Sequence, residues 1–140
     1  MNCPFCKLDP KRNKILYEGK TVFVMPSNPR LVEGHLLVIP KRHIEKPSEL
    51  THEERRELMD VVLTFQEKIV KKVSTGCDIR QNFRPFQKQN DLKVDHIHFH
   101  LIPRNLNDVI YEKYEKIQRD VFHLISEEEL DKTIGKLNNE

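Results

Sequence analysis

The feature that most constrains the fold of this 140-residue chain is a segment in which histidines alternate with apolar residues, Val94-Asp95-His96-Ile97-His98-Phe99-His100-Leu101-Ile102-Pro103. Successive side chains of a strand point to opposite faces of a sheet. The segment therefore predicts a strand over 94–103, with His96, His98 and His100 in a row on one face and apolar residues in a core on the other. Such a row of imidazoles can bind a metal, supply a nucleophile flanked by acid and base groups, or form a polar surface stripe.

Short β-rich runs predict four further strands. Their ranges, bounded by turn residues, are 14–18, 21–25, 35–40 and 77–83. Gly19 and Lys20 separate the first two runs, which predicts a hairpin with a two-residue turn. The run over 35–40 is apolar almost throughout, as is typical of a central strand that is covered on both faces.

One long helix is expected between the third and fourth of these runs. Thr51 followed by Glu54 forms a capping box, and apolar residues then recur at steps of three and four until the chain reaches Gly76. Further helices are expected over 108–119 and from Ser126 onward. This order of elements predicts an α+β fold with a mainly antiparallel sheet, a long helix and carboxy-terminal helices.

Length and charge narrow the functional classes. A chain of 140 residues fits one domain, and its net charge of +2 does not favour binding to a nucleic-acid polymer. No apolar run reaches the roughly 18 residues of a membrane span, so no membrane partner is expected. We also expect no signal peptide, because the first residues lack a basic and apolar leader. Three cysteines, an odd number, argue against a disulfide framework, so we expect a cytoplasmic protein.

Two of the three cysteines, Cys3 and Cys6, form a Cys-x2-Cys pair. The spacing fits half of a zinc site whose other two ligands lie elsewhere in the chain. It also fits a redox-active dithiol, although such a pair usually opens a helix after a strand, or two cysteines without a shared role. Cys77 has no partner nearby in the sequence and fits a small buried apolar residue.

The histidine segment resembles the signature of the histidine triad (HIT) family, in which three histidines alternate with apolar residues. A second stretch, from Gly34 to His43, is similar to the family's strand that enters from Gly-His and leaves through Pro-Lys-x-His. The two stretches also have the family's order and spacing. The likeness covers residues 1–104, so we expect one HIT-like domain over 1–140, with a core of about 1–104 and a helical carboxy-terminal extension over 105–140.

The resemblance implies a homodimer, a five-stranded sheet in each protomer, and nucleotide hydrolase or transferase activity. The middle histidine, His98, would attack the α-phosphorus of a nucleotide, and His100 would contact the phosphate and assist the leaving group. Asn82 matches the family's phosphate-side asparagine, and His35 resembles its supporting histidine. Related transferases have Gln at the third position of the triad, so His100 favours hydrolysis of dinucleoside polyphosphates or nucleoside phosphoramidates.

Some HIT proteins hold structural zinc, and the resemblance extends to the zinc ligands. These proteins use an amino-terminal Cys-x2-Cys pair, the histidine after Pro-Lys-x and the first triad histidine, which here are Cys3, Cys6, His43 and His96. Two cysteines and two histidines suit a closed zinc site. Zinc at this place would pin the amino terminus to the segment that carries His98.

Two stretches depart from the family pattern. Asp91-Leu92-Lys93-Val94 stands where many members have Gly-Gln-Ser/Thr-Val, so Lys93 would supply charge to the phosphate as a point cation. The loop before the Gly-His strand lacks the Asp that holds the ribose in many members. Ser27 or Asn28 would take its place.

Other functions stay open at this point. The chain could be a nucleotide-binding regulatory protein with little activity, a nucleotidyltransferase, or a protein whose three histidines bind a catalytic metal. The expected partner is a purine nucleotide or a dinucleoside polyphosphate. Repair of adenylated nucleic-acid ends fits less well, because the chain is nearly neutral.

Overall fold

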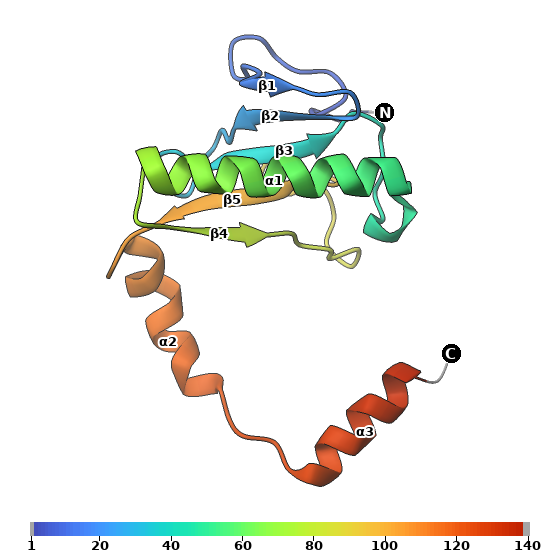
Figure 1. The fold of residues 1–140 in the computed structure, drawn as a ribbon, viewed down its shortest axis with the longest axis vertical. Helices are drawn as coiled ribbons and strands as arrows, with labels where there is room; N and C mark the ends of the chain where they lie inside the picture. Colours follow the sequence, from blue (N-terminus) through green and yellow to red (C-terminus); the bar gives the residue numbers. More distant parts are fainter. Residues whose placement is uncertain (1, 139–140) are drawn as a thin grey trace. The chain divides into compact units, whose positions relative to one another are not determined.

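The computed structural model describes residues 2–138. These residues fall into two compact units that divide after Leu106. Figure 1 shows a sheet and one long helix in the first unit and shorter helices in the second. All of the predicted site residues lie in the first unit, and each unit is described by itself.

Five strands form one sheet in the first unit, in the order β1-β2-β3-β5-β4, and each neighbouring pair is antiparallel. The strands are β1 (Tyr17–Glu18), β2 (Val22–Pro26), β3 (Leu36–Pro40), β4 (Gly76–Arg80) and β5 (Phe99–Arg104). The central strand β3 is buried throughout, as expected for a strand that is covered on both faces. The predicted α+β class, with a five-stranded antiparallel sheet and one long helix, is confirmed.

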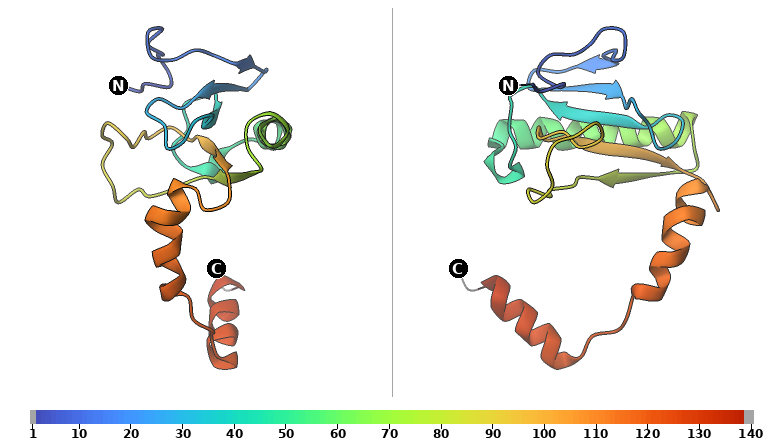
Figure 2. Two further views of the ribbon diagram at one scale, coloured as in Figure 1. Left: turned by 90° about the vertical axis from the view of Figure 1, so that its left-hand side faces the viewer. Right: turned by 180° about the vertical axis from the view of Figure 1, so that it is seen from behind.

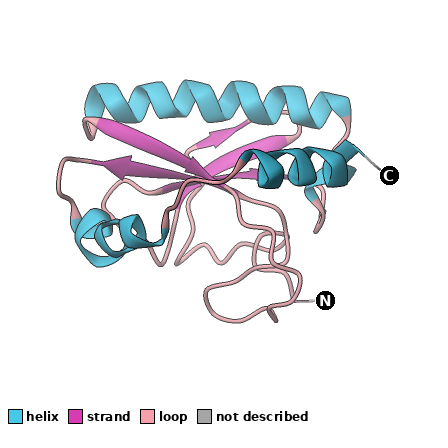
Figure 3. Ribbon diagram, turned by 90° about the horizontal axis from the view of Figure 1, so that it is seen from below, coloured by secondary structure: helices cyan, strands magenta, loops and turns pink. Residues whose placement is uncertain are grey.

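The long helix, α1 (His52–Lys72), follows a 3₁₀ turn, η1 (Pro47–Glu49), and covers one face of the sheet (Figures 2 and 3). It begins with the predicted capping box, in which the Glu54 amide donates to the Thr51 hydroxyl and the Thr51 amide donates to the Glu54 carboxylate. Its apolar side packs on the sheet to form the main core. The main core comprises Val22, Val24, Leu36, Val38, Ile44, Leu50, Leu58, Val61, Val62, Phe65, Ile69, Ile97 and Leu101.

The opposite face of the sheet carries a second apolar cluster beside the histidines. This second cluster comprises Phe23, Met25, Leu37 and Ile39, with Phe5 and Leu8 of the amino-terminal segment packed against it. Leu37 lies opposite His100 in the register between β3 and β5, so the two side chains share this face. The amino-terminal segment therefore lies on the face of the sheet that carries His100.

The hairpin between β1 and β2 has its turn one residue later than predicted. The Gly19 amide donates to the Val22 carbonyl at 2.8 Å, so Lys20 and Thr21, instead of Gly19 and Lys20, form the two-residue connection. A carboxylate from α1 is the reason. Glu57 accepts the backbone amides of residues 20–22 and the Thr21 hydroxyl, and this long-range contact is not visible in the local sequence.

The strand that carries the histidines is shorter than predicted. β5 begins at Phe99, so His100 lies within it, whereas His96 and His98 precede it in an irregular segment. Pro40 ends β3 and has no amide hydrogen to extend the ladder between the two strands. The expected strand over 94–103 is therefore wrong at its start.

Side chains of the histidine segment nevertheless alternate between the main core and the opposite face of the sheet even before β5 begins. The Ile97 amide donates to the Ile44 carbonyl at 2.8 Å, and Ile97 packs in the main core. The ring of His98 lies 4.9 Å from that of His100, between ring centroids, on the other side of the chain. Alternation thus predicts the faces correctly even where regular pairing is absent.

The second unit is helical. Helical turns run from η2 (Tyr111–Glu115, a π-helical turn) through α2 (Lys116–Gln118) to η3 (Arg119–Val121, a 3₁₀ turn). The last helix, α3 (Glu127–Asn138), follows Ser126, whose hydroxyl accepts the Glu129 amide at 3.1 Å. Among the described residues, no helix combines the length and the apolar character that crossing a membrane requires.

Candidate active site and metal site

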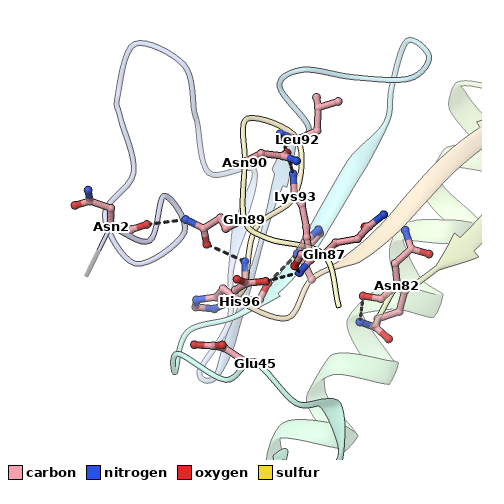
Figure 4. Close-up of polar contacts among 12 residues, drawn as sticks. Asn2, Glu45, Asn82, Gln87, Gln89, Asn90, Leu92, Lys93 and His96 are labelled. Carbon is pink, nitrogen blue, oxygen red and sulfur yellow. Dashed lines mark hydrogen bonds and ion pairs between the residues drawn. The ribbon is translucent and has the colours of Figure 1, made fainter. Parts of the chain in front are cut away.

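A groove runs beside the segment that leads into β5. His98 and His100 line this groove, which has a volume of about 840 Å³ and is walled by the loop over 81–95. Polar contacts tie the loop to the amino-terminal segment (Figure 4): the Gln89 side-chain amide donates to the Asn2 carbonyl at 3.0 Å, and Gln89 Oε1 accepts the Asp95 amide at 3.0 Å. Segments far apart in the sequence therefore hold the histidine groove in place.

His98 has one protonated and one unprotonated ring nitrogen. Its Nδ1 lies 2.8 Å from the His96 carbonyl oxygen, which can only accept a hydrogen bond, so Nδ1 carries the proton. Nε2 then holds the lone pair. Burial lowers the pKa of His98, which keeps the ring neutral at pH 7. A neutral imidazole with this tautomer can act as a nucleophile through Nε2.

A chain of hydrogen bonds fixes the tautomers of His35 and His100. The Leu31 amide donates to Nδ1 of His35 at 3.1 Å, so His35 carries its proton on Nε2. That Nε2–H donates to Nδ1 of His100 at 2.9 Å, which places the proton of His100 on Nε2. His100 is therefore a hydrogen-bond donor, and its ring lies 4.9 Å from that of His98, between centroids.

Both histidines of this pair are held neutral. Burial is the largest cause, and positive charge on Arg80 and on neighbouring imidazoles also opposes their protonation. Together these effects lower the pKa of His35 to about 4 and that of His100 to about 3. At neutral pH the pair therefore acts through hydrogen bonds and carries no charge.

The low pKa values of His35 and His100 predict that mild acid destabilises the fold. The unfolded chain takes up protons on these residues near pH 6.5, whereas the folded chain does so only near pH 4 and 3, so the stability is full above pH 6.5 and falls as the pH drops toward 4. We expect the free energy of unfolding to fall by at least about 1 kcal/mol from pH 7 to about pH 5. Urea titrations should show a weaker pH dependence in His35→Gln than in the wild type or in the control His52→Gln; equal dependence in all three would contradict the assignment.

The four predicted metal ligands meet beside the groove. Sγ of Cys3 and Cys6 and Nδ1 of His43 and His96 all lie within 4.8 Å of one another. Cys3 Sγ is 3.4 Å from His96 Nδ1, Cys6 Sγ is 3.3 Å from His43 Nδ1, and the two Nδ1 atoms are 3.2 Å apart. A tetrahedral zinc site with Zn–S of about 2.3 Å and Zn–N of about 2.0 Å has ligand separations of about 3.3–3.8 Å. The three separations of 3.2–3.4 Å are close to these values, and no pair of the four atoms lies more than 4.8 Å apart.

The imidazole nitrogens that face one another in this cluster both hold lone pairs. His96 Nε2 donates to the Pro40 carbonyl at 2.7 Å, and His43 Nε2 donates to the Glu45 carboxylate at 3.0 Å, so in the neutral rings both Nδ1 atoms hold lone pairs. Two lone pairs at 3.2 Å repel each other unless a cation lies between them. A carbonyl and a carboxylate are also the partners that orient histidines in zinc sites. The residues thus fit a closed site for zinc.

Two of the predicted substrate residues, Asn82 and Lys93, line the groove. The Asn82 backbone carbonyl accepts a hydrogen bond from the Gln81 side chain at 2.8 Å. The Lys93 ammonium forms an ion pair with Asp95 at 2.9 Å and donates to the Gln87 carbonyl (Figure 4). The positive charge of Lys93 is therefore partly neutralised by residues of its own loop.

Three further predicted substrate residues, His35, Ser27 and Asn28, are not among the residues that line the groove, and the last two lie on the loop after β2. The Ser27 hydroxyl donates to the Pro29 carbonyl at 2.8 Å, and Asn28 exchanges hydrogen bonds with Arg12 at 3.1 Å. The Ser27 amide donates to the His35 carbonyl, which ties this loop to the supporting histidine. Contact of Ser27 and Asn28 with a ribose stays a prediction.

Two further residues lie against the histidines. The Phe5 ring packs edge-to-face on the His98 ring, with centroids 5.0 Å apart. Arg80 lies opposite His100 in the register between β4 and β5. The place of Phe5 between the two cysteines is visible in the sequence and could have indicated that this ring lies near the histidines. The position of Arg80 opposite His100 depends on the register between two strands, which the sequence alone does not give.

Several known proteins are similar to this chain. The model of the HIT domain matches residues 9–107. An uncharacterized HIT-like protein of Methanocaldococcus jannaschii is 32% identical over 119 residues, which cover 83% of this chain and 89% of the relative. An adenosine 5′-monophosphoramidase of Schizosaccharomyces pombe is 30% identical over 110 residues, 74% of this chain and 75% of the relative. A bis(5′-adenosyl)-triphosphatase of Dictyostelium discoideum is 29% identical over 113 residues, which cover 76% of this chain and 73% of the relative.

Solved structures agree with these sequence relatives. A HIT family protein from Bacillus anthracis superposes with a TM-score of 0.73 at 25% identity, and the match covers 99% of this chain and 96% of that one. A zinc-bound histidine triad family protein from Mycobacterium smegmatis superposes with a TM-score of 0.65 at 25% identity, and the match covers 77% of this chain and 78% of that one. The sheet, the long helix and the order of the strands are thus a known arrangement.

Proposed function

The chain belongs to the HIT domain family, and from this premise we propose that it is a nucleotide hydrolase that cleaves at the α-phosphate through a nucleotidyl-histidine intermediate. The observation that supports this most strongly is the pairing of two neutral histidines in one groove, His98 with a lone pair on Nε2 and His100 with a proton on Nε2. One ring can attack while its neighbour donates a hydrogen bond. Relatives named as a phosphoramidase and a triphosphatase support the same class of reaction.

In the first proposed step, Nε2 of His98 attacks the α-phosphorus while the bond from phosphorus to the leaving group breaks. The His98 ring gains positive charge as the N–P bond forms, and the His96 carbonyl, which already accepts its Nδ1–H, stabilises that charge. The Nε2–H of His100 donates to a non-bridging phosphate oxygen. The leaving group is either an amine, which water protonates as it departs and which leaves hydroxide, or the nucleoside phosphate that forms the rest of a dinucleoside polyphosphate.

In the second step, water attacks the α-phosphorus of the nucleotidyl-histidine. The N–P bond breaks, a nucleoside monophosphate is released, and the lone pair returns to Nε2 of His98. The proton that the attacking water loses passes to solvent, where it neutralises the hydroxide that remains when an amine leaving group is protonated by water. His35 acts through His100, because its Nε2–H keeps the proton of His100 on the nitrogen that does not face His35. Splitting the displacement into two easier steps is the general advantage of covalent catalysis.

The proposed substrate is a purine nucleotide that carries either an amine or a further phosphate on its α-phosphate. Asn82 and Lys93, which line the groove, are the proposed phosphate contacts. Ser27 and Asn28 are the proposed contacts on the ribose side. Nucleoside phosphoramidates and dinucleoside polyphosphates both fit this description.

We also assign the cluster of Cys3, Cys6, His43 and His96 as a structural zinc site. The converging lone pairs on the two imidazoles support it, as does the zinc-bound relative from Mycobacterium smegmatis. Zinc with four protein ligands has no open position for substrate, so its contribution is to hold the fold. The residues of the cluster would tie the amino-terminal segment to the chain just before His98.

A panel of substrates tests the proposed function. Adenosine 5′-monophosphoramidate or a diadenosine polyphosphate should be hydrolysed with kcat/KM of about 10⁴ M⁻¹ s⁻¹ or more, and nucleotide sugars far more slowly. Micromolar binding of a purine monophosphate with no turnover of any substrate would contradict the hydrolase and favour a regulatory binding protein. Turnover that requires an acceptor other than water would favour a transferase.

The proposal extends to a homodimer in the cytoplasm. β4 lies at one edge of the sheet, with its second side unpaired among the described residues, and such an edge can pair with another copy of the chain. Light scattering of the purified protein should give twice the 16.7 kDa mass of the chain. The cellular location stays a prediction.

A further inference from the structure

Phe5 lies in a tight turn between Cys3 and Cys6, the two cysteines of the metal cluster. The amides of Cys6 and Lys7 both donate to the Cys3 carbonyl at 3.2 Å, which bends the chain around Phe5. The Phe5 side chain is half-buried and packs against the second apolar cluster on the histidine face of the sheet. The ring is therefore fixed from two sides, by the turn that carries it and by the cluster beneath it.

The Phe5 ring contacts two histidines of the triad. Its centroid lies 5.0 Å from that of His98, with the ring planes at 78°, and 5.9 Å from that of His96, with the planes at 80°. Both are edge-to-face arrangements at favourable distances for aromatic pairs. Phe5 thus connects a ring of the metal cluster to the ring of the proposed nucleophile.

His98 needs side-chain contacts of this kind, because no strand pairing holds its backbone. β5 begins at the next residue, Phe99. The hydrogen bond from Nδ1 to the His96 carbonyl holds one edge of the ring. The ring of His100, whose centroid is 4.9 Å away and whose plane is at 71° to that of His98, restricts rotation of the His98 ring. The Phe5 ring is a second neighbour that restricts the same rotation.

We propose that Phe5 is a positioning residue for His98, and that its ring, carried between Cys3 and Cys6, holds the His98 imidazole in the orientation that attack on phosphorus requires. The proposal rests on the proposed function, in which His98 is the nucleophile. Attack on the α-phosphorus demands alignment of the nucleophile with the leaving group, and small misplacements of a reacting group reduce rates strongly. The arrangement makes the metal site a support for the reaction as well as for the fold.

Three variants separate positioning from general packing. Phe5→Leu keeps apolar volume but removes the ring, and we expect kcat to fall about 10-fold with KM changed less than about 2-fold. Phe5→Tyr keeps the ring and should restore kcat to within about 2-fold of the wild type. Leu8→Ala is the matched control, because Leu8 packs against the same cluster but carries no ring.

Nuclear magnetic resonance of histidine-labelled protein gives a second readout that does not depend on turnover. The His98 ring signals, assigned by their absence from His98→Ala, should shift or broaden in Phe5→Leu and stay in place in Leu8→Ala. Removal of the metal with a chelator should perturb the same signals in the wild type. The metal content of Phe5→Leu should stay at the wild-type value, since Phe5 offers no ligand atom.

Failure of the Phe5 proposal and failure of the proposed function give different results. Unchanged kcat and unchanged His98 signals in Phe5→Leu would overturn the proposal, as would an equal loss of kcat in Leu8→Ala or a loss of metal from Phe5→Leu. If the wild type fails to turn over any substrate in the panel, the proposed function fails. The ring signals in Phe5→Leu then still decide whether Phe5 orients His98.

Discussion

Replacement of His98 by alanine should slow hydrolysis of the best substrate in the panel by about 10⁴-fold or more. The variant removes the lone pair on Nε2, which is the group that forms the bond to phosphorus in the proposed first step. The groove, His100 and the metal cluster stay in place, so binding of the nucleotide should change much less than kcat. Steady-state kinetics and calorimetric binding of adenosine monophosphate measure the two effects separately.

His52→Ala is the control for this variant. His52 is exposed at the start of α1 and is not among the residues that line the groove, so its loss should leave kcat within about 2-fold of the wild type. Thermal unfolding of both variants shows whether either change disturbs the fold. Hydrolysis by His98→Ala at a rate within about 10-fold of the wild type would mean that another group attacks the phosphorus.

Replacement of Cys3 by serine should remove the bound metal and lower the free energy of unfolding by about 3 kcal/mol or more. Cys3 is 7% exposed, and its sulfur lies 3.4 Å from His96 Nδ1, so the substitution would leave the cluster with three of its four ligands. Metal that binds only the folded chain contributes its binding free energy to folding. Metal analysis and urea titrations measure the two effects.

Cys77→Ser is the matched control, because Cys77 is partly buried and lies outside the metal cluster. Burial raises the pKa of the Cys77 thiol to about 11, so this cysteine stays protonated and behaves as an apolar residue. We expect Cys77→Ser to keep the full metal content and to lose less stability than Cys3→Ser. Equal metal content in Cys3→Ser and the wild type would contradict the assigned ligand set.

The sequence predicted the features that depend on periodicity and on short-range chemistry. Alternation in the histidine segment correctly placed Ile97 and Leu101 in the main core, and the capping box of Thr51 and Glu54 starts α1 as expected. These signals suffice because burial of an apolar face and satisfaction of helix-end amides act on neighbouring residues. The set of four metal ligands followed from the family resemblance and not from spacing alone.

The features that the sequence did not predict depend on contacts between distant segments. The turn of the first hairpin is displaced because Glu57 of α1 binds its amides. The strand over 94–103 starts late because Pro40, on another strand, cannot extend the ladder. The tautomers of the histidines likewise depend on partners such as the Leu31 amide, which only the folded chain brings to His35.

Trapping of the intermediate shows whether His98 forms a covalent bond to the α-phosphorus. The wild-type protein is mixed with adenosine 5′-monophosphoramidate labelled on its phosphorus, quenched with base within one turnover, and digested for mass spectrometry. We predict a label that is stable in base and labile in acid, as expected for a phosphorus–imidazole bond, on the peptide that contains His98. Turnover without label on that peptide, or an unchanged label in His98→Ala, would contradict it.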